Sequence, residues 1–140
     1  MIQKFKAIGL KSNTWIYGTD LYHYSKSIQI LIQGGAFDVH PDTISQYIGT
    51  EDSEGNEIYE NDIVEYSIPQ RSEMGDIITE TYNRGVVFFS YETLAFCLGV
   101  KQGGETHICS FADLLECNFK LKVVGNRFDD LTRCSEKPNN

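Results

Sequence analysis

The amino-acid sequence predicts a mainly β protein with one short helix. Several short segments are rich in β-branched and aromatic residues, and segment 62–68 alternates apolar with polar side chains, as a strand with one buried face does. Glycine pairs and short polar runs separate these segments, which is typical of turns. At 140 residues, the chain has the usual size of one domain.

The N-terminal segment 1–56 is predicted to form a β-meander followed by an acidic turn. Strands are expected at 5–8, 15–18, 21–24, 28–32 and 44–48, with the Gly34-Gly35 pair ending the meander. The acidic turn covers 51–57, where Gly55 is suited to a positive φ angle at a hairpin tip.

Segment 57–126 is predicted to contain the main core. Further strands are expected at 62–68, ended by Pro69, and at 85–89, 93–100, 106–110 and 120–125. The polar segment 70–83 is interpreted as a long loop or a mobile, twisted hairpin, and it is where internal disorder is expected. Ser110 is placed to cap the short helix 111–117, with Asp113 at its third position.

The C-terminal segment 127–140 is predicted to be a polar tail that frays from Arg133 onward, because it has little apolar surface to bury. The three segments are expected to form one compact unit.

Charge is concentrated in one part of the chain. The net charge is −8, and residues 27–70 hold nine acidic residues without a lysine or arginine. These acids are Asp38, Asp42, Glu51, Asp52, Glu54, Glu57, Glu60, Asp62 and Glu65. A phosphate backbone would be repelled there, which disfavours direct binding of nucleic acid.

The chain lacks the signals of secretion or membrane insertion. Its longest mainly apolar stretch, 28–32, is far shorter than the roughly 20 residues of a membrane span. The N-terminus has no signal-peptide pattern. We therefore expect a cytoplasmic protein whose four cysteines (Cys97, Cys109, Cys117 and Cys134) are free thiols.

No motif for catalysis or metal binding is present. The cysteines form no C-x-x-C pair, and His23, His40 and His107 are far apart in sequence. The acidic turn departs from the calcium-loop order, because glycine comes at its fourth position rather than its sixth. We assign no catalytic, cofactor-binding or metal-binding residue and expect no cofactor. An enzyme with an unrecognised site stays an alternative.

Three blocks of sequence resemble a known family. Segment 15–18 (WIYG) is followed by 41–50 (PDTISQYIGT) and 52–64 (DSEGNEIYENDIV), and together they resemble the signature of the YopX family of phage and prophage proteins. Segments 85–88 and 123–126 fit its closing strands, so that the resemblance spans about residues 4–130. The family commonly has glycine where this chain has Asn61, and asparagine tolerates the same positive φ angle.

The resemblance implies a β-rich fold with a small SH3-like barrel at 57–126, encoded by a phage or an integrated element, and no established activity. We expect 58–64 to form the entry to this barrel. Tyr59, Ile63 and Val64 would pack there, while Glu60 and Asp62 face solvent or bond to a turn.

The function that we expect is that of a non-enzymatic accessory protein in a bacterial host, acting through protein–protein contacts. Seventeen aromatic residues favour this hypothesis, because buried tyrosine hydroxyls need partners and some tyrosines should therefore lie at a rim or an interface. Homo-oligomers are expected because β-rich chains have sheet edges to cover. The alternative is an acidic DNA mimic that inhibits a host nucleic-acid-binding protein.

Overall fold

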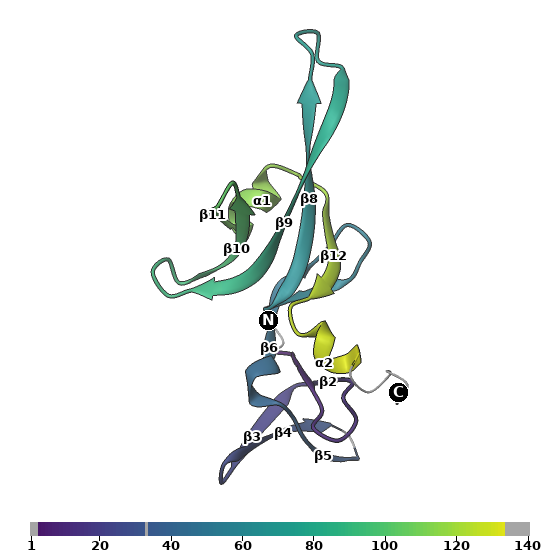
Figure 1. The fold of residues 1–140 in the computed structure, drawn as a ribbon, viewed down its shortest axis with the longest axis vertical. Helices are drawn as coiled ribbons and strands as arrows, with labels where there is room; N and C mark the ends of the chain where they lie inside the picture. The colour runs from purple at the N-terminus through teal and green to yellow at the C-terminus, as the bar shows by residue number, and fades with distance from the viewer. Residues whose placement is uncertain (1–2, 33, 134–140) are drawn as a thin grey trace.

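A computed structural model describes residues 3–32 and 34–133. It is an elongated molecule, with a large sheet at one end of the long axis and two small sheets towards the other (Figure 1). The strands are β1 (Phe5–Ile8), β2 (Trp15–Gly18), β3 (Asp20–Tyr24), β4 (Ser27–Ile32), β5 (Gly35–Asp38), β6 (Ser45–Glu51), β7 (Glu57–Tyr59), β8 (Asp62–Arg71), β9 (Ile77–Ser90), β10 (Ala95–Gln102), β11 (Glu105–Ser110) and β12 (Leu121–Asn126). The helices are short: η1 (Pro41–Thr43), α1 (Phe111–Glu116) and α2 (Asp129–Arg133). The predicted mainly β class is confirmed.

The predicted N-terminal meander is divided between two sheets. Strands β3, β4 and β5 form an antiparallel meander, whereas β1 and β2 belong to a second sheet with the order β2-β1-β6-β7. The chain changes sheets after Gly18, where an added Cβ would lie 3.0 Å from the carbonyl oxygen of Leu31. This close approach lets β2 pack beside β4, and the small core of Ala7, Ile30 and Val39 forms between the sheets.

The main core lies on one face of a five-stranded antiparallel sheet with the order β11-β10-β9-β8-β12. Val64, Val87 and Leu98 are fully buried there, and Phe111 and Leu114 of α1 pack on them. Ser110 caps α1 as predicted, its Oγ accepting a hydrogen bond of 3.1 Å from the backbone N–H of Asp113.

The expectation of a small closed barrel needs correction. Within the described residues the five-stranded sheet is open, with β11 and β12 as its two edges. Helix α1 packs against β10 and β11. Its apolar side chains cover the core side of the sheet, so the core is buried without the two edge strands meeting.

Of two other expectations about 62–83, the first is wrong and the second agrees with the structure in one of its two readings. Pro69 does not end the strand, because β8 continues to Arg71 with Pro69 opposite Glu80 of β9. The pairing of β12 with β8 reaches only Tyr66, so Pro69 has a neighbouring strand on one side alone, which is where proline is tolerated. Segment 70–83 is an ordered part of a long hairpin, as one of the two readings of this segment proposed, and not a loop.

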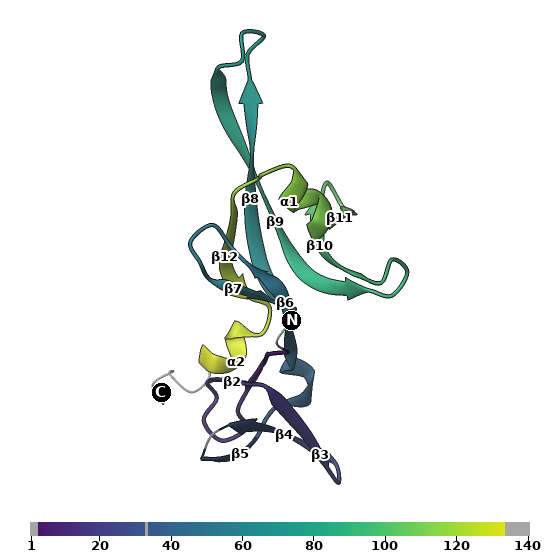
Figure 2. The same ribbon diagram turned by 180° about the vertical axis from the view of Figure 1, so that it is seen from behind.

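The predicted polar tail begins with a helix. Segment 129–133 forms α2, which lies beside β2 in both ribbon views (Figure 2). The predicted fraying concerns mainly residues 134–140, which lie outside the described part of the chain. No helix in the described residues is long and apolar enough to cross a membrane.

The cysteines and special turns agree with the sequence. Cys97 is buried, Cys109 packs against the main core and Cys117 is exposed, all as free thiols, while Cys134 lies outside the described residues. Gly55 and Asn61 have positive φ angles of 86° and 70°, as predicted for both turns.

Val64 tests the position of the main core. Its side chain is fully buried, whereas Ile63 is only partly buried, so a carboxylate at 64 carries the larger penalty. We expect Val64→Asp to unfold the protein, because burying an unpaired carboxylate costs several kcal/mol, comparable to the whole stability of a small domain. Circular dichroism with urea denaturation measures this.

The matched control is Val124→Asp on β12, where the native side chain is 39% exposed. This variant is expected to keep a cooperative transition. Equal stability of the two aspartate variants would contradict the placement of the core.

Candidate interaction surface and the polar junction beside it

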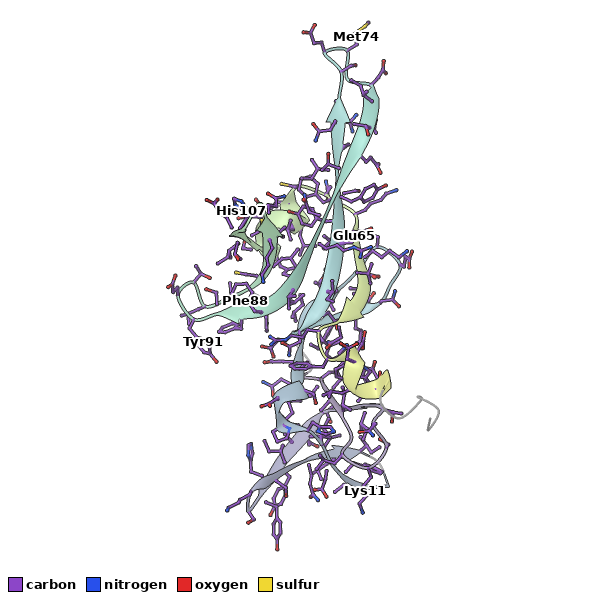
Figure 3. The ribbon with its side chains drawn as sticks, in the orientation of Figure 1. Lys11, Glu65, Met74, Phe88, Tyr91 and His107 are labelled. Carbon is purple, nitrogen blue, oxygen red and sulfur yellow. The ribbon has the colours of Figure 1, made fainter. Side chains whose placement is uncertain are left out.

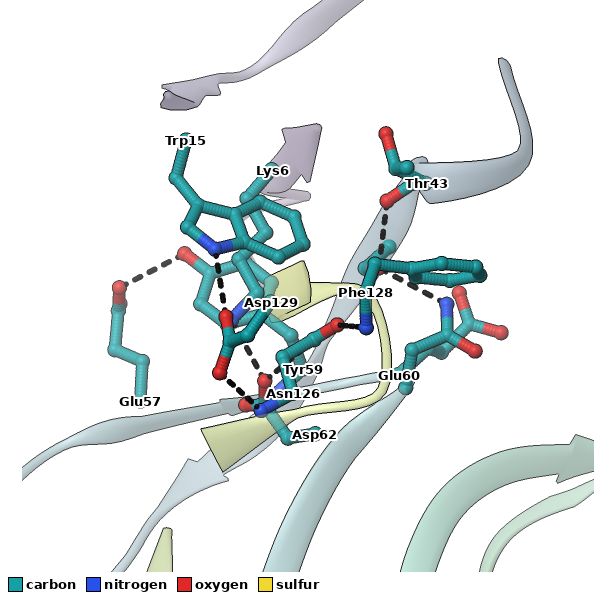
Figure 4. Close-up of polar contacts among 12 residues, drawn as sticks. Lys6, Trp15, Thr43, Glu57, Tyr59, Glu60, Asp62, Asn126, Phe128 and Asp129 are labelled. Carbon is teal, nitrogen blue, oxygen red and sulfur yellow. Dashed lines mark hydrogen bonds and ion pairs between the residues drawn. The ribbon is translucent and has the colours of Figure 1, made fainter. Parts of the chain in front are cut away.

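A buried ion pair joins the N-terminal sheets to the large sheet. Lys6 Nζ of β1 donates a hydrogen bond of 2.7 Å to Asp62 Oδ1 at the start of β8 (Figure 4). The two side chains are only 9% and 1% exposed. The other oxygen, Asp62 Oδ2, accepts a 2.8 Å bond from the backbone N–H of Tyr59. The sequence led us to expect that Asp62 either faces solvent or bonds to a turn. It bonds to the turn at Tyr59, and its side chain is buried.

The hydrogen-bond network extends from this pair to the C-terminal helix. Asn126 Nδ2 donates to Asp62 Oδ1 at 2.9 Å, and the Asn126 side-chain oxygen accepts from the backbone N–H of Phe128. Asp129 Oδ2 accepts from the backbone N–H of Asn126, and its Oδ1 accepts from Trp15 Nε1 at 3.2 Å. One polar cluster thus connects β1, β2, β8, β12 and α2. We name it the junction, and its residues are Lys6, Trp15, Tyr59, Asp62, Asn126 and Asp129.

Aromatic rings surround the lysine. Lys6 Nζ lies 4.7 Å from the ring centroid of Trp15 and 4.9 Å from that of Tyr59. Such cation–π contacts attract the ammonium group to the faces of the rings and hold it in place. Burial and then the hydrogen bond to Glu57 raise the pKa of the Tyr59 phenol well above its usual range, so this hydroxyl acts as a donor.

An open hollow of about 530 Å³ lies against this cluster. It is lined by Lys6, Tyr17, Asn56, Glu57, Tyr59, Asp62 and Val123. The charged groups in its wall already have partners, since Lys6 pairs with Asp62, and Glu57 pairs with Lys4. The arrangement is that of a structural joint, in which each charge meets a fixed opposite charge or donor.

The three histidines lie on separate parts of the fold. His23 lies on β3, His40 directly precedes η1 and His107 lies on β11, so the fold does not gather them. Within residues 3–32 and 34–133, no group of three His, Cys, Asp or Glu side chains is arranged to hold a metal ion.

The nine acids of segment 27–70 do not form a common exposed face. Asp52 and Asp62 are buried. Asp38, Glu54, Glu57, Glu60 and Glu65 each have a hydrogen bond or ion pair within the chain. The negative charge therefore serves mainly to hold turns and strands together, which counts against a DNA mimic.

The acidic turn is tied to the edge of the large sheet by Asp52. Its Oδ1 accepts from the backbone N–H groups of Glu54 and Asn56, and its Oδ2 accepts from that of Val123 in β12 at 3.0 Å. Burial opposes the charge, but these backbone bonds outweigh it and lower the pKa of the Asp52 carboxyl. This side chain is therefore a clamp between the turn and β12.

The most prominent exposed feature is the free end of the β8–β9 hairpin, residues 70–83, which we name the arm. It projects beyond the rest of the molecule, with Met74 at its tip (Figure 3). The apolar side chains of the arm are largely uncovered: Met74 is 90% exposed, Ile78 70%, Tyr82 60% and Ile77 55%.

The arm is nevertheless an ordered turn and ribbon. The backbone N–H of Ser72 donates to the carbonyl of Asp76, and Gly75 has a φ angle of 89°. Arg71 Nη1 donates to the carbonyl of Gly75 at 2.9 Å. Sequence reasoning missed the arm as a surface, although Ile77-Ile78 within an otherwise polar segment was the available signal.

Several tyrosines are exposed, as the sequence led us to expect. Tyr22 and Tyr24 stack with their ring centroids 6.4 Å apart on β3, and both are at least half exposed. Tyr17, Tyr82 and Tyr91 are exposed as well, whereas Tyr59 and Tyr66 are buried.

The comparison with protein families agrees with the resemblance seen in the sequence. The YopX protein family matches residues 4–132, nearly the whole chain. The chain belongs to the YopX family. None of the curated proteins matches it.

Most of the residues in block 52–64, which carries much of the YopX resemblance, contribute to the packing or hydrogen bonding of the fold. Within the block 52–64, Asp52 clamps the acidic turn, Tyr59 and Asp62 form the junction, and Ile58 and Val64 lie in the main core. Membership in the YopX family therefore reflects how this fold is held together and assigns no activity.

The junction predicts a large loss of stability on breaking its ion pair. We expect Asp62→Asn to lower the free energy of unfolding by about 3–5 kcal/mol, because it leaves Lys6 buried without a countercharge. Lys6→Met in the same chain should recover part of the loss, since it removes the orphaned cation. Urea denaturation of the two single variants and the double variant measures the coupling.

Arg84→Ala, which removes the exposed pair with Glu65, is the control and should cost about 1 kcal/mol or less. A cost for Asp62→Asn no greater than that of the control would contradict the structural role of the junction.

Asp52 predicts a specific loss of stability in acid. Its folded-state pKa lies below the ordinary value of 3.8, so its stabilisation is present above that pH and is lost as the pH falls through the folded pKa. Wild type should therefore lose more free energy of unfolding than Asp52→Asn between neutral pH and pH values below 3.8. Parallel pH profiles for the two proteins would reject this role.

Proposed function

We propose that this protein is a non-enzymatic accessory protein of a phage or prophage, working in the bacterial cytoplasm by binding another protein through its arm. The observation that carries this proposal is the projecting ribbon whose four large apolar side chains are each more than half exposed. Soluble proteins seldom present such a feature unless it serves an interaction. An isolated two-stranded ribbon is also only marginally stable in water, so a partner that covers it would stabilise it.

The charges of the arm indicate the chemistry of its partner. The arm carries three acidic residues, Glu73, Asp76 and Glu80, and its one cation is Arg71, which bonds to the carbonyl of Gly75. The complementary surface is an apolar cleft with a basic rim. The arm would insert into this cleft, with Ile77 and Ile78 as anchors.

Two observations make the other function classes less well supported. Around the hollow at the junction, the charged side chains are paired with one another, which favours a structural role over acid–base chemistry. The acids that a DNA mimic would need on one face are partly buried and largely bonded within the chain. Protein binding through the arm accounts for an exposed feature that neither alternative explains.

The test compares two double variants that each remove exposed apolar side chains. Ile77→Ser/Ile78→Ser alters the arm, and Tyr22→Ser/Tyr24→Ser alters the opposite end of the molecule as the control. Tagged proteins are purified from the host, and the co-purifying protein is identified by mass spectrometry. The isolated pair is then measured by calorimetry. We expect the arm variant to bind at least about tenfold more weakly, since two lost anchors cost more than about 1.4 kcal/mol.

The control variant should bind as wild type does, and all three proteins should melt at the same temperature because the changed side chains are exposed. A partner that binds the arm variant with unchanged affinity would contradict the proposal. So would a wild-type chain that retains no partner at all.

A further inference from the structure

The two edge strands of the large sheet, β12 and β11, differ in whether another segment of the chain covers them. The β12 edge is covered by the acidic turn: the backbone N–H of Ser53 donates to the carbonyl of Leu121 at 2.9 Å, and Ser53 Oγ accepts from the N–H of Leu121 at 3.0 Å. Asp52 adds its bond to Val123, and the strand register shifts between Val123 and Gly125. Covering and irregularity are the usual protections of an edge strand.

The opposite edge, β11, has no such cover. It pairs with β10 along its whole length, from Cys97 opposite Ser110 to Gln102 opposite Glu105. In the described part of the chain, no backbone group from another segment bonds to its outer side. Both ribbon views place β11 at the margin of the sheet opposite β12 (Figures 1 and 2).

The β11 sequence also lacks the features that prevent pairing. Segment 106–110 (THICS) contains no lysine, arginine, acidic residue or proline, and its pairing with β10 has no register shift. Ile108 at the centre of this segment is 63% exposed, although isoleucine is a strong strand former. Segment 106–110 therefore offers a regularly paired, uncharged edge with an apolar side chain in its middle.

We propose that β11 pairs with β11 of a second copy of this chain, antiparallel and about a twofold axis at Ile108. A twofold axis perpendicular to the sheet places residues of the same face opposite each other, so the two Ile108 side chains meet, with Thr106 opposite Ser110 and His107 opposite Cys109. Two five-stranded sheets then become one continuous sheet.

The self-complementary sequence of β11 favours a second copy over a foreign strand. In this register no charged residue faces a like charge, because Glu105 lies beyond the paired segment and the net negative charge of the chain is carried elsewhere. The contact is isologous, which is the commonest arrangement in protein dimers. It does not involve the arm, so the dimer and the proposed function stand independently.

A cysteine placed at the axis tests the register directly. In a Cys117→Ser/Cys134→Ser background, Ile108→Cys should form a disulfide-linked dimer on mild oxidation. Directly opposed residues in antiparallel strands lie about 4.5–5.5 Å apart between Cα atoms, which is within disulfide range. The matched control is Thr106→Cys, also exposed on β11, which faces Ser110 of the second copy and should stay monomeric on a non-reducing gel.

Light scattering behind a sizing column tests the dimer itself. Wild type should elute at about twice the chain mass of 15.9 kDa, and Ile108→Lys at the chain mass, with an unchanged circular dichroism spectrum. Ile78→Lys on the arm is the control that should stay dimeric.

Three results would overturn the proposal: a monomeric wild type at micromolar concentration, a dimer that persists in Ile108→Lys, or equal cross-linking at 106 and 108. A wild-type monomer whose β11 amides become protected from exchange only with a different protein would assign the edge to a foreign strand instead.

Discussion

Lys6 and Asp62 are 56 residues apart in the chain, and their buried ion pair is the contact on which the arrangement of the molecule depends. Removing two charges from water is costly unless each finds several partners. Asp62 has three, namely the ammonium of Lys6, the amide of Asn126 and the backbone N–H of Tyr59. Such a network is satisfied in one arrangement of strands only, and it fixes where the N-terminal sheets join the large sheet.

From this joint the chain builds two ends of different character. The N-terminal end is a pair of small sheets around a few aliphatic side chains, and the other end is a sheet closed off on one side by α1. The acid-rich segment, residues 27–70, runs through both ends, and most of its carboxylates bond to turns, to strand edges or to lysine side chains. An acidic composition thus reflects internal bonding here, and the arm and Ile108 of β11 are among the places where apolar side chains are exposed.

Edge protection explains which surfaces remain for partners. The acidic turn bonds to β12 and removes one edge of the large sheet from competition. The β11 edge keeps backbone groups that pair with no other strand of the described chain, and the arm keeps exposed apolar side chains. The arm carries exposed apolar side chains and three acidic residues, and segment 106–110 of β11 is uncharged and self-complementary.

The sequence by itself determined the mainly β class, most strand positions, the capped helix after Ser110 and the YopX resemblance, because alternation, turn residues and caps are local signals. It did not reveal the division of the meander, the open sheet, the arm or α2. It also left open whether Asp62 faces solvent. Those depend on contacts between residues far apart in the chain. Asp129 meets Trp15 only in the folded chain, and the pairing with Lys6 gives the Asp62 carboxylate a buried place that its polarity alone would not predict. Only the tertiary structure supplies the partners that offset the cost of burying it.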